Sequence, residues 1–191
     1  KNRKFKNVVG VEPARNLRIL NLKKKIDINT NFFSKKFSEK MKKKYKSFDL
    51  ITANNVFAHS PHLYDFSQGV KNLLSTKGVF VLEVSYLPTV LTKKTFDTIY
   101  HEHMSYHALK PLVNFFKMQN LEVFDFQLVE AQGGSIRIFV SHKNSFTVKE
   151  EKIKGQIKKE VSQGLFLTNR YARFYKEINE TKIKLKKIIK N

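Results

Sequence analysis

The sequence contains no cysteine among its 191 residues, and this absence excludes two kinds of site. Without thiols there is no disulfide framework and no thiolate ligand for zinc or an iron–sulfur cluster. No apolar run approaches the roughly 20 residues that span a bilayer. The basic residues Lys1 to Lys6 lead into no apolar stretch of the signal-peptide kind. We therefore expect a soluble, cytoplasmic protein with no membrane partner.

Acidic residues are few: 16 Asp and Glu stand against 37 Lys and Arg, a net charge of +21. Such a balance is found in nucleic-acid binders, because basic side chains neutralise phosphates. The excess is mostly lysine, however, and it is spread from Lys1 to Lys190. Its densest run, Lys35 to Lys46, lacks the arginine, glycine and repeated aromatics of a strand-binding groove. We expect mostly solvated surface charge and no nucleic-acid partner.

Strand and helix signals alternate along the first half of the chain. Short apolar runs typical of buried parallel strands lie at Val8 to Glu12, Phe48 to Ala53 and Val79 to Val84, with a further short element at Asp27 to Phe33. Helical spacing occurs at Arg15 to Lys25, Ser34 to Lys46 and Leu63 to Leu74, and Thr76 to Gly78 is typical of a turn. This alternation predicts an α/β fold: a parallel sheet with helices on both faces.

The pattern changes after Ser85. Tyr86 to His107 is polar and typical of a loop, whereas Pro111 to Met118 has helical spacing. Two strands, Glu122 to Val129 and Ser135 to His142, are joined by a short Gly-rich link, which predicts an antiparallel hairpin at one edge of the sheet.

Val148 to Lys190 is lysine-rich with helical periodicity, interrupted at Gly155 and Gly164. Its apolar side includes Ile153, Ile157, Phe166 and Phe174. We expect a partial catalytic domain over residues 1–145 and a helical tail over 146–191, leading toward an absent C-terminal domain.

The Gly-rich turn that cradles a nucleotide after the first strand of such sheets is missing. The first recognisable strand already ends in Glu12, where an acidic side chain holds ribose hydroxyls, although a surface carboxylate also explains it. We expect a fragment without its first strand, with an unpaired strand edge in mid-sheet and weak or no cofactor binding.

Two polar segments are candidates for chemistry. Asn54 to His59 follows a buried strand at the edge where ligands bind, although asparagines also commonly end strands. Tyr100 to His107 gathers three imidazoles, a carboxylate and two phenols in eight residues. His101 and His103 are two residues apart, whereas a helical zinc pair needs a spacing of four. We favour general acid–base catalysis over a metal site, with a solvated polar loop as the remaining alternative.

The order of five segments resembles the S-adenosylmethionine-dependent sugar C-methyltransferases. These segments are VGVEPA, FDLITANNVFAHSPHLYDF, LLSTKGVFVLEVSYL, FDTIYHEHMSYHAL and GGSIRIFV, within residues 8–142. The resemblance implies a Rossmann-like class I methyltransferase sheet, S-adenosylmethionine as cofactor and a nucleotide-linked keto-deoxysugar as substrate. Zinc is implied only for an N-terminal cysteine-bearing segment that these residues lack, and a monomer is expected.

The resemblance also implies roles for individual residues. The cofactor-binding candidates are Glu12, Pro13, Asn54 and Asn55; the catalytic candidates are His59, Tyr100, Glu102 and His103; the substrate-pocket candidates are Gly133, Gly134, Ser135 and Arg137. His103 is the expected base, Glu102 its orienting partner or a sugar-hydroxyl acceptor, and Tyr100 or His59 the donor to an enolate oxygen. Arg137 has the alternative of a strand salt bridge. An O- or N-methyltransferase and a polyanion-binding domain remain alternative functions.

Overall fold

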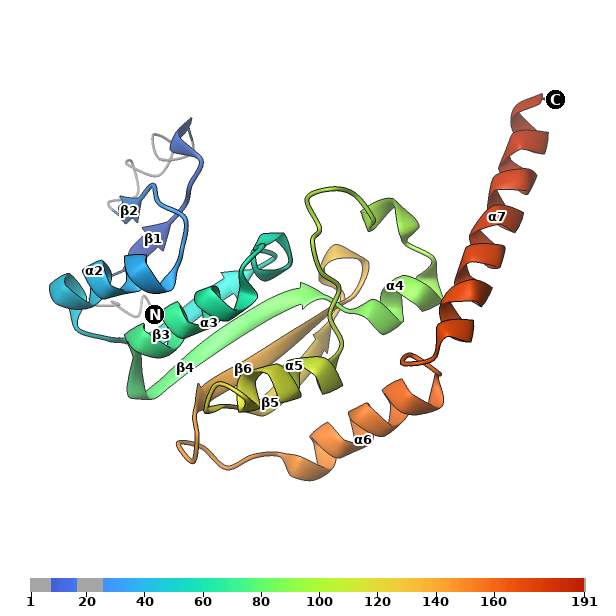
Figure 1. Ribbon diagram of the computed structural model, residues 1–191. Helices are drawn as coiled ribbons and strands as arrows, with labels where there is room; N and C mark the ends of the chain where they lie inside the picture. The colour runs from blue at the N-terminus through green and yellow to red at the C-terminus, as the bar shows by residue number, and fades with distance from the viewer. Residues whose placement is uncertain (1–7, 17–25, 191) are drawn as a thin grey trace, which may run out of the picture.

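The computed structural model describes residues 8–16 and 26–190, which form two sheets (Figure 1). The smaller sheet pairs β1 (Val9–Val11) in parallel with β2 (Asp27–Asn29). The larger sheet has the order β3-β4-β6-β5, with β3 at Phe48–Asn54, β4 at Leu74–Ser85, β5 at Leu121–Val129 and β6 at Ser135–His142. β3 and β4 are parallel, while β6 is antiparallel to both neighbours. The predicted Rossmann-like sheet with a hairpin at one edge is confirmed.

Except for α4, the described helices lie close to the predicted positions. They are α2 (Lys35–Tyr45), α3 (Leu63–Leu73), α4 (Leu87–Lys93), α5 (Leu109–Lys117), α6 (Glu150–Ser162) and α7 (Thr168–Lys190), with short 3₁₀ turns η1 (Phe57–His59), η2 (Phe96–Thr98) and η3 (Ala131–Gly133). The Ser34 hydroxyl caps α2 by accepting from the Phe37 amide at 3.0 Å. The helix predicted from Arg15 does begin there, and its continuation from residue 17 lies outside the described residues.

Two predictions about the middle of the chain are wrong. No turn separates α3 from β4, because the strand begins at Leu74 and includes Thr76 to Gly78. A Cβ on Gly78 would lie 2.9 Å from the Phe48 carbonyl oxygen, so glycine serves close strand approach here. The segment after Ser85 is also not all loop, since α4 begins at Leu87 with proline in its first turn.

The tail also departs from its predicted pattern. Gly155 lies inside α6 and does not interrupt it, whereas Gly164, with φ of 69°, lies between α6 and α7. Ile153 and Phe174 are buried as predicted, but Phe166 is 43% exposed. Phe166 lies in the turn between the two helices, where the Lys110 ammonium sits 4.9 Å from its ring centroid.

The main core lies between the larger sheet and α3 and α5, which cross in front of it in Figure 1. Phe80 on β4 and Phe116 on α5 are fully buried with ring centroids 6.2 Å apart, and Phe57 of η1 stacks on Phe116 at the same separation. The strands alternate: Leu82 faces this core, whereas Leu50, on the opposite face of the sheet, is 50% exposed.

The outer edge of β3 has no strand partner within the described residues, because β1 and β2 form a sheet of their own. β3 is the end strand of the larger sheet, and the expected unpaired edge in mid-sheet stays a prediction. The carboxyl ends of β1 and β3 therefore belong to separate sheets, although cofactor-binding candidates lie at both: Glu12 follows β1, and Asn54 ends β3.

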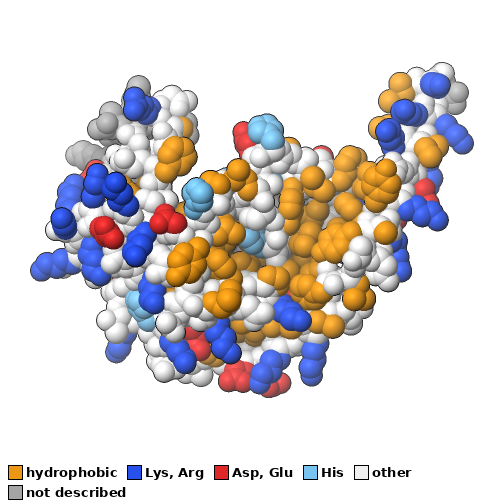
Figure 2. All heavy atoms as spheres, in the orientation of Figure 1, with side chains coloured by type: hydrophobic (Ala, Val, Ile, Leu, Met, Phe, Trp, Pro, Cys, Tyr) orange, Lys and Arg blue, Asp and Glu red, His pale blue; other side chains and the backbone are white. Residues whose placement is uncertain are grey.

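The tail extends from the body as two helices, and α7 projects away from the sheet (Figure 1). Every residue from 181 to 190 is exposed, and Figure 2 shows basic and hydrophobic side chains intermixed on this tip. Lys and Arg side chains also gather on the surface over α2 (Figure 2). In the part of the chain that the structure describes, no helix is long and apolar enough to cross a membrane.

Candidate active site

His103 lies in the connection between η2 and α5 with both ring nitrogens engaged. Its Nδ1 is 2.7 Å from the Thr98 carbonyl oxygen, and its Nε2 is 3.2 Å from the Tyr100 hydroxyl. A carbonyl oxygen only accepts, so Nδ1 carries the hydrogen and Nε2 of the neutral ring carries the lone pair. The Tyr100 hydroxyl then donates to Nε2. The surroundings thus fix the tautomer that exposes Nε2 as a base.

His59 joins this pair from the other side. It ends η1, which follows β3 at the carboxyl end of the sheet, and its ring meets the His103 ring edge-on with centroids 4.8 Å apart. The Met104 amide donates to the Ala58 carbonyl at 2.9 Å, which ties the two loops together next to these rings. The structure therefore brings together three predicted catalytic residues from two distant segments.

Glu102 does not belong to this cluster. Its side chain is 60% exposed, and its Oε1 lies 4.0 Å from Nε2 of His101, whose side chain is 90% exposed. The Thr98 carbonyl, and not Glu102, orients the His103 ring. The alternative role of Glu102, as acceptor for a substrate hydroxyl, stays a prediction.

Two further side chains of the segment support the cluster. The Tyr106 hydroxyl donates to the same Thr98 carbonyl at 3.0 Å, and desolvation raises the pKa of Tyr106. His107 is buried against Phe57, with its Nε2 2.9 Å from the Ser105 hydroxyl, and burial lowers the pKa of His107 to about 4. His107 is therefore a neutral core residue and not a second base.

The cofactor candidates end strands of the two separate sheets. Glu12 follows β1, and its Oε1 accepts from the Ala14 amide at 2.9 Å. Asn54 ends β3, and Asn55 adopts a left-handed conformation with φ of 54° while its amide donates to the Glu83 carbonyl. A carboxylate accepts from ribose hydroxyls, and amide side chains suit an amino-acid terminus, so these side-chain types fit S-adenosylmethionine.

The predicted substrate-pocket residues have structural partners. The Arg137 guanidinium places Nε and Nη2 at 2.8 and 2.6 Å from Oε2 of buried Glu83, directly opposite on β4. This is the strand salt bridge that was the alternative for Arg137. Gly134 has φ of 130°, and a Cβ there would meet Cγ2 of Thr89 at 2.4 Å, while the Ser135 hydroxyl donates to the Ala131 carbonyl. A direct role in substrate binding stays a prediction for all four.

Within residues 8–16 and 26–190, no group of three or more His, Asp or Glu side chains is arranged to hold a metal ion.

Comparison with known families decides the identity. The sequence model of a methyltransferase domain family matches residues 2–125, well over half of the chain. The chain belongs to this methyltransferase family. A second model, described as a C-methyltransferase C-terminal domain, matches residues 130–191, so the predicted resemblance to C-methyltransferases is confirmed.

Individual relatives agree with this assignment. C-methyltransferase NovU of Streptomyces niveus is 29% identical over 183 residues, which are 96% of this chain and 44% of NovU. The chain thus spans less than half the length of this curated relative. An S-adenosylmethionine-dependent methyltransferase of Anabaena variabilis matches with a TM-score of 0.55 and 12% identity, over 72% of this methyltransferase and 68% of its own chain. An S-adenosylmethionine-dependent methyltransferase of Clostridium acetobutylicum matches with a TM-score of 0.50 and 15% identity. The match covers 72% of this chain and 76% of that protein's chain. The fold is that of S-adenosylmethionine-dependent methyltransferases.

Proposed function

We propose that this chain carries the catalytic residues of a C-methyltransferase that acts on a nucleotide-linked keto-sugar. The observation that supports it most is the fixed tautomer of His103, with Nδ1 on the Thr98 carbonyl and Nε2 facing Tyr100. Carbon becomes a methyl acceptor only after it loses a proton beside a carbonyl group, so C-methylation needs such a base.

The first step is proton removal. His103 Nε2 takes the proton from the carbon beside the ketone, the C–H electron pair forms the enolate, and the resulting imidazolium keeps its Nδ1–H bond to Thr98. Tyr100 must leave Nε2 for this step, and its hydroxyl is then free to donate to the enolate oxygen. His59, edge-on to His103, is the second candidate donor.

Glu12, Asn54 and Asn55 would hold S-adenosylmethionine, which supplies an electrophilic methyl group when bound. That methyl group would be transferred to the enolate carbon, and the substrate would regain its ketone. Positioning of the nucleophilic carbon accounts for the rest of the catalysis.

Solvent deuterium exchange tests the base directly. Purified protein is mixed with a nucleotide-linked keto-sugar in D₂O, and incorporation beside the ketone is followed by mass spectrometry. We expect exchange by the wild type, a loss of about 10²- to 10⁴-fold in His103→Ala, and little change in His101→Ala. His101 is the matched control, because it is an exposed imidazole two residues away.

Full exchange by His103→Ala would remove this residue from the role of base. If the wild type gives no exchange and transfers methyl to an oxygen or nitrogen atom, the proposal that carbon is the acceptor atom is wrong.

A further inference from the structure

A fully buried carboxylate in the tail contacts the segment that carries His103. Glu160 lies on α6, in an otherwise lysine-rich helix, and has no exposed surface. Its Oε1 accepts from the Leu109 amide at 2.6 Å and the Tyr86 hydroxyl at 2.7 Å, and its Oε2 accepts from the Lys110 amide at 3.0 Å. Burying a carboxylate is unfavourable unless donors surround it, and here three do.

Two of these donors belong to the first turn of α5. The residue before that helix, Ala108, has no side chain that can cap it, so its first amides lack partners from their own helix. Glu160 supplies the missing acceptor from more than 50 residues away, and its negative charge suits the positive end of the helix dipole. The start of α5 is therefore fixed by a residue of the tail.

The third donor fixes the other side of the same segment. Tyr86 follows β4, forms a parallel bridge with His107, and also accepts a hydrogen bond from the Gln156 amide group at 2.8 Å. The Leu87 amide donates to the His107 carbonyl at 2.9 Å. Glu160 thus joins the end of β4 to the point where the His103 segment enters α5.

We propose that Glu160 is a positioning residue for His103, an inference that rests on the proposed function. Between Met104, whose amide is held by Ala58, and Leu109, whose amide is held by Glu160, there are only four residues. One of these four residues, Tyr106, donates to the Thr98 carbonyl that orients His103, so a displacement of Leu109 reaches the Thr98–His103 hydrogen bond through Tyr106. Through this contact the C-terminal part of the chain controls the geometry of the base.

The test reads the His103 ring itself. In chain labelled with ¹⁵N-histidine, long-range ¹H–¹⁵N spectra distinguish Nδ1–H from Nε2–H, and loss of a signal in His103→Ala assigns the residue. The wild type is expected to give a single Nδ1–H form. Glu160→Gln replaces one carboxylate oxygen with an NH₂ group, so either the Leu109 or the Lys110 amide faces a donor in place of its acceptor. We therefore expect mixed tautomers and at least tenfold slower deuterium exchange.

Asp125→Asn is the matched control. Asp125 holds the beginning of α6 through Lys149 and Lys152, each 2.7 Å away, and it has no part in the α5 contact. We expect this variant to lower thermal stability without changing the His103 spectrum. Tyr86→Phe removes a single donor and should give a smaller shift toward mixed tautomers; it replaces Glu160→Gln if that variant does not fold.

A single His103 tautomer and wild-type exchange in Glu160→Gln would reduce Glu160 to a purely structural residue and overturn the proposal. Mixed tautomers in Asp125→Asn would also overturn it, because any loosening of α6 would then act on His103. The spectra need no substrate, so a wild type that fails to exchange deuterium contradicts the proposed function alone.

Discussion

Acidification should destabilise the protein through His107. This side chain is 7% exposed, and burial lowers its pKa to about 4 from an ordinary value near 6.5. As pH falls through 6.5 the unfolded chain takes up a proton at this position, whereas the folded chain does so only near pH 4. The stability that the neutral ring contributes is therefore complete above pH 6.5 and is lost as pH falls.

The size of the effect follows from the two pKa values. Their separation corresponds to a loss of about 3 kcal/mol in the free energy of unfolding between pH 7 and pH 4. The free energy of unfolding of a small domain is about 5 to 15 kcal/mol, so this loss is a large share of the total stability.

Urea unfolding at several pH values measures the loss, with His107→Phe as the reference. In the wild type the ring centroids of His107 and Phe57 are 5.4 Å apart. Phenylalanine at position 107 keeps an aromatic ring beside Phe57 but cannot take up a proton. Hydrogen-bonded carboxylates such as Asp125, whose pKa is lowered, also reduce stability in acid. They do so equally in the wild type and the variant, so their contribution cancels when the two losses are subtracted. Wild type should lose about 3 kcal/mol more than the variant. Equal losses in the two proteins would refute a depressed His107 pKa.

Two further predictions concern the approach of Gly134 to Thr89 of α4 and the pairing of β6 with β4. Gly134→Ala combines an unfavourable φ with a clash on Thr89, so it should lower the free energy of unfolding by about 3 kcal/mol in urea, and Thr89→Ala in the same chain should restore part of it. Arg137→Met leaves buried Glu83 without its cation and should cost about 3 kcal/mol; in a double-mutant cycle, adding Glu83→Met should recover most of that loss. Unchanged unfolding midpoints in either single variant would contradict these assignments.

Local patterns were sufficient for most strands and helices. Apolar runs such as Phe48–Asn54 are short and bounded, and a run of this length has few alternatives to a buried strand. The same local view failed at Thr76 to Gly78, where composition is typical of a turn, because the decisive contact is the approach of the distant Phe48 carbonyl. It also failed at α4, because a helix of seven residues is too short to establish a helical period among its apolar positions.

In the candidate site, too, some residues could be predicted from the sequence and others could not. His59, Tyr100 and His103 stand out by residue type, and the structure does bring them together. The group that orients the His103 ring is the Thr98 carbonyl. Every residue has a backbone carbonyl, so the sequence alone does not single this one out. Glu160 does not stand out in the sequence, because α6 carries two other glutamates and the partners of Glu160 lie 50 or more residues away.

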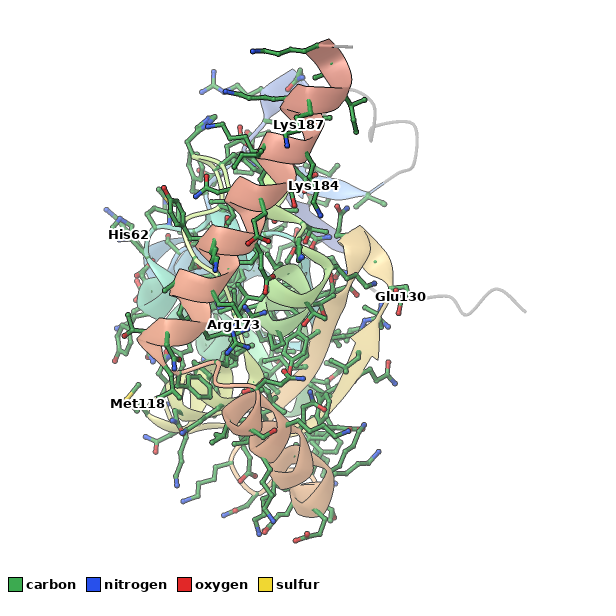
Figure 3. The ribbon with its side chains drawn as sticks, turned by 90° about the vertical axis from the view of Figure 1, so that its right-hand side faces the viewer. His62, Met118, Glu130, Arg173, Lys184 and Lys187 are labelled. Carbon is green, nitrogen blue, oxygen red and sulfur yellow. The ribbon has the colours of Figure 1, made fainter. Side chains whose placement is uncertain are left out.

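The exposed tip of α7 also has a consequence for local motion. Every residue from 181 to 190 is exposed, so hydrogen bonds within α7 are the main interactions that hold this part of the helix. Lys184 and Lys187, which lie along its outer part in Figure 3, are three residues apart and repel each other. The amides of α7 beyond buried Phe174 should therefore exchange with solvent faster than those of the core, because this part of the helix opens without unfolding the rest.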